Sequence, residues 1–211
     1  DDWACEARRY YFNIVGKYGA PVQTLLKKAA GLDIATICPL HGPVLKDNLG
    51  YYLDLYNTWS SYQPEDKGIL VAYASIHGNT AKAAEKLAEM LREKGAEKVV
   101  VSDLAREDMA EVIEDAFRYD RMILAAASYD AGVFPCMQDF LHHLQSKAYQ
   151  NRKVGIMENG SWAPTAARTM KSILETMKNI EIVEPVVTIR SVMKDSDLPE
   201  MEKLADAMTT K

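Results

Sequence analysis

The stretch from Gly68 to Thr80, GILVAYASIHGNT, constrains the fold of this chain more than any other. It begins with an unbroken apolar run of strand length, which is typical of a strand that a parallel sheet buries on both faces. A loop of small hydroxyl and amide residues follows at Ser75, and a helical pattern begins at Ala81. Free backbone N–H groups and the positive end of the helix dipole favour an anion at such a junction. The sequence therefore predicts a phosphate site here.

Strand and helix patterns alternate from Gly68 to the end of the chain. Five such units in a row predict an α/β fold, with a doubly wound, five-stranded parallel sheet and helices on both faces. The most apolar strand is expected at the centre, whereas Pro185 in the last run indicates an edge strand or a break. The predicted strands are 69–74, 97–102, 120–128, 153–158 and 180–189, and the predicted helices are 81–94, 108–117, 137–149, 163–178 and 198–208.

The preceding part of the chain has helical patterns at 3–15, 22–30 and 48–59 and one short strand pattern at 33–38. That strand leads into His41 within the sequence LHGP. A polar, proline-containing stretch, SSYQPEDK, follows the third helix and predicts a linker, which we place at residues 63–67. The chain begins Asp-Asp-Trp without an initiator Met, and we expect it to be a piece of a longer polypeptide.

The composition argues against several classes of partner. A formal net charge of −5 disfavours nucleic acid. No apolar run is long enough to cross a bilayer, so we expect no membrane partner. Cys5, Cys38 and Cys136 lie far apart and form no CxxC pair, which argues against a disulfide framework and favours a reducing, cytoplasmic location.

In an open parallel sheet the ligand binds outside the carboxyl ends of the strands, so the loops after the first, third and fourth strands are the candidates. The first loop has no Lys or Arg, which disfavours a nucleoside triphosphate. A terminal monophosphate suits it better, because backbone N–H groups and two hydroxyls can enclose one. The alternative is a capped strand–helix turn. The predicted phosphate-loop residues are Ser75, Ile76, His77, Gly78, Asn79 and Thr80.

The other two loops carry aromatic residues among small ones. In the second loop, small residues would let a flat ring approach the backbone, although a plain surface turn is the alternative. In the third, Trp162 either stacks on a ligand or belongs to a subunit interface. Together the loops outline a site for a phosphate and a planar aromatic body, which suits flavin mononucleotide (FMN). Their predicted cofactor-binding residues are Ser128, Tyr129, Asp130, Ala131, Gly132, Val133 and Phe134, followed by Asn159, Gly160, Ser161, Trp162 and Ala163.

The region from Gly68 to about Met208 resembles a flavodoxin domain, because SIHGNT is similar to that family's S/T-x-T-G-N-T phosphate loop. It departs at His77, where many flavodoxins have Thr, which leaves this side chain free to approach the ring or a partner. SIHGNT combined with SYDAGVFP, NGSWAPTAAR and a preceding LHGP resembles one subgroup more closely, the flavodiiron proteins or A-type flavoproteins. The resemblance covers essentially the whole chain.

This resemblance implies two parts. Residues 1–62 are expected to be the C-terminal remnant of a metallo-β-lactamase-like diiron domain, and residues 68–211 a flavodoxin-like FMN domain with strand order 2-1-3-4-5. Proteins of the family reduce oxygen or nitric oxide. Their flavin takes electrons from a rubredoxin-like or NAD(P)H-linked donor (a flavin reductase) and passes them singly to the diiron centre. The two centres meet across a head-to-tail dimer, so the resemblance implies a homodimer.

By resemblance, His41 is the last histidine ligand of the diiron centre, although a lone His beside Pro is by itself more often a structural turn residue. The family's other metal ligands have no counterpart in this sequence. A two-metal site needs several His and carboxylate ligands, so we expect the diiron centre only in the intact protein and no stoichiometric iron in this chain. We predict no catalytic side chain.

Two other functions are compatible with the fold. An FMN-dependent quinone reductase would share the fold and cofactor but leaves the first sixty residues unexplained. A cofactor-free interaction domain predicts a colourless protein. A phosphoacceptor signalling domain is disfavoured, because it needs clustered acidic residues after the first strand, and residues 75–80 contain none.

Overall fold

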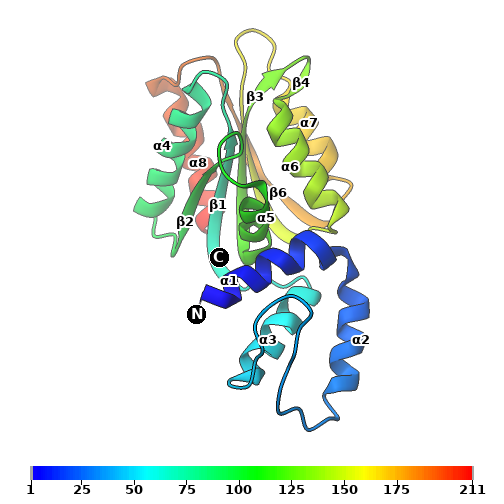
Figure 1. Ribbon diagram of the computed structural model, residues 1–211. Helices are drawn as coiled ribbons and strands as arrows, with labels where there is room; N and C mark the ends of the chain where they lie inside the picture. The colour runs from blue at the N-terminus through cyan, green and yellow to red at the C-terminus, as the bar shows by residue number, and fades with distance from the viewer. Residues whose placement is uncertain (1, 211) are drawn as a thin grey trace.

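The computed structural model describes residues 2–210 and shows a parallel sheet between two layers of helices, with further helices at one end (Figure 1). The predicted fold class and strand order are confirmed. The strands run in the order β2-β1-β3-β5-β6, and a two-residue strand, β4 (Gly132–Val133), pairs antiparallel with β3. The parallel strands are β1 (Asp66–Ala74), β2 (Val99–Asp103), β3 (Tyr119–Tyr129), β5 (Gln150–Asn159) and β6 (Lys178–Ile189).

Each face of the sheet has its own hydrophobic core, because successive side chains of a strand point to opposite faces. In β1, Leu70 and Ala72 join the core beneath α5, α6 and α7, whereas Ile69 and Val71 join the core beneath α4 and α8. All four residues are buried, as the apolar run predicts. The covering helices are α4 (Asn79–Glu93), α5 (Met109–Arg118), α6 (Pro135–Ser146), α7 (Ala166–Leu174) and α8 (Leu198–Thr209).

The edge position predicted from Pro185 is confirmed. β6 pairs only with β5 within the described sheet, and the register between them shifts near this proline. A proline has no N–H to donate, so an edge strand is where a sheet tolerates one. The helix predicted at 163–178 is shorter in the structure, since α7 ends at Leu174 and β6 already begins at Lys178.

Residues 2–60 contain α1 (Asp2–Tyr10), a π-helical turn (Tyr11–Val15), a 3-10 turn (Gly16–Tyr18), α2 (Gly19–Ala29) and α3 (Leu49–Ser60). The strand predicted at 33–38 is wrong: a single bridge between Ile37 and Leu45 is the only strand-like pairing described in this segment. A short apolar run forms a strand only where a neighbouring strand can pair with its backbone, and the described residues provide none there. None of the described helices is long and apolar enough to span a membrane.

The predicted linker overlaps β1, which begins at Asp66, and one hydrophobic core spans the predicted boundary. Tyr11, Phe12 and Trp59 are buried in the same core as the strands. The ring of Phe12 stacks on that of Phe117 in α5, with 4.1 Å between centroids and 14° between planes. The leading helices are therefore packed tightly on the sheet.

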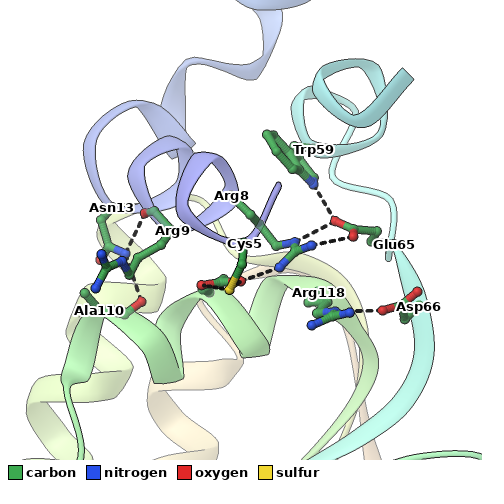
Figure 2. A network of polar contacts seen from close by, with 10 residues as sticks. Cys5, Arg8, Arg9, Asn13, Trp59, Glu65, Asp66, Ala110 and Arg118 are labelled. Atoms are coloured by element: carbon green, nitrogen blue, oxygen red, sulfur yellow. Dashed lines mark hydrogen bonds and ion pairs between the residues drawn. The ribbon is translucent and has the colours of Figure 1, made fainter. Parts of the chain in front are cut away.

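A buried polar network reinforces this packing (Figure 2). Arg8 of α1 is 2 % exposed and forms ion pairs with both Glu65 and Glu114. The indole N–H of Trp59 donates to Glu65, and the Cys5 thiol donates to Glu114. Burial raises the pKa of the Glu114 carboxyl, an effect that Arg8 only partly offsets. The network thus joins α1, α3, α5 and the segment entering β1.

Candidate functional site

A cavity of about 390 Å³ lies at the carboxyl ends of β1, β3 and β5, within the size range of small-molecule and cofactor sites. The position is the one expected for a doubly wound sheet. All but four of the predicted cofactor-binding residues line it. The lining residues are Ser75, Ile76, His77, Asn79, Thr80, Ala127, Ser128, Tyr129, Asp130, Ala131, Asn159, Gly160, Ser161, Trp162, Ala163, Thr165 and Ser191.

One end of the cavity is the start of α4. Gly78 precedes the helix with φ +88°, a left-handed conformation that favours glycine, and its N–H donates to the Ser75 hydroxyl at 3.0 Å. The first helical bond recorded at this end runs from the N–H of Lys82 to the carbonyl of Gly78 at 3.0 Å. The N–H groups of residues 79–81 precede that bond and have no acceptor among the described residues. They remain available for an anion.

The side chain of Thr80 adds a hydroxyl to this end. Thr80 is 3 % exposed and lines the cavity, and no described residue hydrogen-bonds its hydroxyl. A hydroxyl at a cavity wall that has no partner within the described chain is suited to a ligand oxygen. No Lys or Arg lines the cavity, and the ionisable lining side chains are His77, Tyr129 and Asp130. The cradle is therefore built from dipoles and hydroxyls, not from cations.

The second wall is the hairpin between β3 and β4. Asp130 and Ala131 form its two-residue turn with φ +47° and +57°, which matches the hairpin turn whose two central residues are both left-handed. Tyr129 stands beside the turn, 45 % exposed, with its ring in edge contact with that of Phe134. Gly132 closes the hairpin by pairing with Tyr129.

Four predicted binding residues do not line the cavity, namely Gly78, Gly132, Val133 and Phe134. Val133 is 2 % exposed and packs in the core, because the hairpin turns alternate side chains toward opposite faces. Phe134 immediately precedes α6, and its half-buried ring contacts the same core. Through these core contacts Val133 and Phe134 hold the hairpin in place.

The third wall is the loop between β5 and α7. A Cβ at Gly160 would lie 2.9 Å from Cα of Pro164 and 3.1 Å from the Ser128 hydroxyl, so only glycine fits there. Trp162 is 88 % exposed at the cavity wall. An exposed indole on a loop presents a large apolar surface beside the cavity, which a ligand or a partner could cover.

Hydrogen bonds between the loops fix their relative positions. The Ser128 hydroxyl accepts from the backbone N–H groups of Thr165 and Ala166 at 2.8 and 3.2 Å, which caps the start of α7. The Thr165 hydroxyl donates to the carbonyl of Gly132 at 2.8 Å. Ser128 was predicted as a cofactor ligand, but its hydroxyl is used within the chain.

Sequence reasoning missed three lining residues, Ala127, Thr165 and Ser191. Thr165 carried a signal, since a Thr after Pro and before an apolar helical pattern is a typical helix start. Ser191 lies after the edge strand β6, outside the three loops that the strand-order argument selects.

His41 lies apart from this cavity. It is exposed, and its ring lies 5.4 Å from that of Tyr10, beside a second cavity that α1 borders. Figure 1 shows the segment between α2 and α3 at the opposite end of the sheet from the β3–β4 hairpin. Among the described residues, no group of three or more His, Cys, Asp or Glu side chains is arranged to hold a metal ion.

Comparison with known proteins places the fold in a family. The model of the flavodoxin domain matches residues 70–195, which is more than half of the chain. The chain belongs to the flavodoxin domain family. This domain contains all three predicted cofactor loops.

Longer matches extend over the leading helices as well. A rubredoxin oxygen:oxidoreductase from Desulfovibrio gigas superposes with a TM-score of 0.89 at 20 % identity, covering 97 % of this chain and 51 % of its own. A mutant flavo di-iron protein from Thermotoga maritima gives 0.83 at 21 % identity, covering 97 % and 50 %. The predicted resemblance to flavodiiron proteins is thus confirmed for the fold of nearly the whole chain.

Curated relatives show the same pattern of coverage. An uncharacterised protein of Methanocaldococcus jannaschii is 23 % identical over 205 residues, covering 95 % of this chain and 51 % of its own length. An anaerobic nitric oxide reductase flavorubredoxin of Escherichia coli is 22 % identical over 173 residues, covering 81 % and 36 %. The chain therefore spans about half the length, or less, of the curated relatives that it matches.

Proposed function

We propose that this chain is the FMN-binding, electron-transfer part of a flavodiiron-type oxidoreductase. The observation that carries the proposal is the cavity, which joins a cation-free anion cradle at the start of α4 to a wall of small residues beside Trp162. A phosphate at one end and a flat ring at the other match these two environments. The flavodoxin domain and the flavorubredoxin and flavodiiron relatives support the same cofactor.

The phosphate end fits a monophosphate. Three unpartnered N–H groups and the Thr80 hydroxyl supply hydrogen bonds, while the α4 dipole supplies roughly half a positive charge, worth about 1 kcal/mol. Hydrogen bonds therefore provide most of the affinity at this end. A triphosphate would require cations that the lining lacks.

The ring end sets the electronic environment. FMN, when bound, supplies the capacity to accept two electrons and to release them one at a time. Asp130 is at the cavity wall and no cation lines the cavity, so added negative charge is disfavoured there electrostatically. The chain orients the ring with its backbone, and its charges favour a low reduction potential.

In the intact protein, we propose, residues 1–62 complete a metallo-β-lactamase-like diiron domain whose preceding part this chain lacks, and His41 is one ligand of its metal. The nine residues of β1 alone span roughly 30 Å between the cavity end and the end that carries the leading helices. Electron transfer over such a distance within one chain is ineffective. This separation supports a head-to-tail homodimer, in which the cavity of one copy faces the metal domain of the other.

The remaining parts of the proposal follow from the relatives. The electron donor is a rubredoxin-like protein or an NAD(P)H-linked flavin reductase, and the terminal acceptor is oxygen or nitric oxide, as the names of the D. gigas and E. coli proteins suggest. Cys5, Cys38 and Cys136 are free thiols in the structure, in keeping with the reducing cytoplasm that we propose as the location.

Titration of the purified chain with FMN tests the proposal. We expect one flavin retained per chain after desalting, measured by visible absorbance, and weaker binding of riboflavin, which lacks the phosphate. A chain that remains colourless and binds neither flavin would be a cofactor-free interaction domain. Turnover of a quinone with NAD(P)H alone, without a donor protein, would instead indicate a quinone reductase.

A further inference from the structure

A fourth loop, residues 190–194 after β6, contributes to the cavity through Ser191. Ser191 has φ +64°, in the left-handed region that residues with a Cβ disfavour. A conformation of this kind persists where the surroundings hold it.

Asn159, the last residue of β5, holds this conformation. Its carboxamide Nδ2 donates to the carbonyl of Ser191 at 2.9 Å, and its Oδ1 accepts from the N–H of Ser191 at 3.0 Å. Asn159 is 7 % exposed, and both polar functions of its side chain are engaged. A planar group with a donor on one side and an acceptor on the other is needed, which Asn supplies and Asp or Leu does not.

Two further bonds join the fourth loop to the third. The Arg190 guanidinium donates to the carbonyl of Trp162 at 3.2 Å, and the N–H of Gly160 donates to the carbonyl of Ile189 at 3.1 Å. The two loops are therefore fastened together at the end of the cavity that carries Trp162, whereas the phosphate cradle belongs to the loop before α4.

We propose that residues 190–194 form a fourth wall of the flavin site, against the ring, and that Asn159 is the positioning residue that sets this wall. The inference rests on the proposed function, because it assigns a role toward the same cofactor. It also revises the expectation for Asn159, whose side chain acts on the flavin through Ser191.

The test compares Asn159→Ala with Asn179→Ala. Asn179 has φ +53° and donates to Oδ1 of Asn151 at 3.0 Å, so it links the same two strands at their opposite ends, far from the cavity. Dissociation constants for FMN and for riboflavin would be measured by fluorescence titration, together with visible circular dichroism of the bound flavin. The free energy of unfolding of each flavin-free variant would show how much either change destabilises the fold.

For Asn159→Ala we expect about tenfold weaker binding of both FMN and riboflavin and an altered visible dichroism. For Asn179→Ala we expect wild-type binding. Asn159→Asp keeps the acceptor for the Ser191 N–H but turns a carboxylate oxygen toward the Ser191 carbonyl, so we expect at least as large a loss, and it serves if the alanine variant fails to fold.

Wild-type affinity and dichroism in the Asn159 variants would overturn the inference, as would weaker binding of FMN alone, since that places the effect at the phosphate. A wild-type chain that binds neither flavin would overturn the proposed function and this inference with it. The two failures are therefore distinguished by the wild-type titration.

Discussion

Arg8 and Glu65 form a two-point ion pair across the junction between α1 and β1, with Nε–Oε2 and Nη2–Oε1 distances of 2.6 and 2.5 Å (Figure 2). The same guanidinium pairs with Glu114 of α5. The buried guanidinium of α1 is thus neutralised by two carboxylates that come from other parts of the chain. Its charge is compensated only while α1 stays packed against α5 and the start of β1.

Replacing Arg8 by Met should destabilise the protein by about 3–5 kcal/mol, because two largely buried carboxylates lose their counter-charge. Urea unfolding at pH 7 measures the change. Arg9→Met is the matched control, since Arg9 is partly exposed and its partners Glu6, Asp108 and Glu111 all have exposed carboxylates, and its loss should cost less than about 1 kcal/mol. Equal effects of the two substitutions would contradict the role assigned to the network.

The Glu114 carboxyl should give the stability a defined pH dependence. Its pKa is raised by burial above the ordinary value of 4.5, so between 4.5 and the raised pKa the folded state binds more protons than the unfolded state. The free energy of unfolding attributable to this group therefore falls as pH rises through that window. Urea unfolding from pH 4 to 8 would be measured for wild type and for Glu114→Gln. The free energy of unfolding of wild type minus that of the variant should fall as pH rises and then level off. A difference that rises with pH would show that Arg8 outweighs burial.

The parallel sheet could be predicted from the sequence because each strand pattern had a neighbour to pair with. The run at 33–38 had the same local signal but no partner strand among the described residues, and it forms only the bridge between Ile37 and Leu45. Pairing is a property of the tertiary structure, which a local pattern does not contain. For the same reason the sequence did not predict the Arg8 network. Arg8, Glu65 and Glu114 are far apart in sequence, and each looks like an ordinary surface charge there.

Removing the Ser128 hydroxyl should loosen the loops around the cavity. Ser128→Ala leaves the N–H groups of Thr165 and Ala166 without their shared acceptor, and we expect a loss of about 1–2 kcal/mol in the free energy of unfolding. Ser172→Ala provides the comparison, because that exposed hydroxyl only bonds a carbonyl of its own helix, and its removal should change stability by less than about 0.5 kcal/mol. If both variants unfold alike, Ser128 is not a cap for α7.

Thr80→Val keeps the shape of the side chain and removes only the hydroxyl at the phosphate end. We expect about tenfold weaker binding of FMN and unchanged binding of riboflavin, measured by fluorescence titration. Thr58→Val is a suitable control, since the Thr58 hydroxyl bonds a carbonyl of α3 away from the cavity. An equal loss of affinity for riboflavin and FMN would show that Thr80 does not contact the phosphate.

That three loops line one cavity could be predicted because the carboxyl ends of neighbouring parallel strands meet at one edge of the sheet, whatever their sequences. The roles of individual side chains could not. Ser128 and Asn159 look like ligands in the sequence, yet both bond to other loops of the chain. Ser191 had no sequence signal at all, since its contribution depends on the left-handed backbone that Asn159 holds.

Trp162 offers a test of the ring end that is free of stability effects. The side chain is 88 % exposed, so Trp162→Ala should leave the free energy of unfolding within about 0.5 kcal/mol of wild type. If the indole covers the flavin ring, the variant should bind FMN about tenfold more weakly, and the bound flavin should fluoresce more strongly because a quenching contact is lost. Leu40→Ala removes an equally exposed apolar side chain, 98 % exposed and away from the cavity, and should change neither property. Wild-type affinity and fluorescence in the Trp162 variant, with one flavin still bound per chain, would assign this indole to a subunit interface instead.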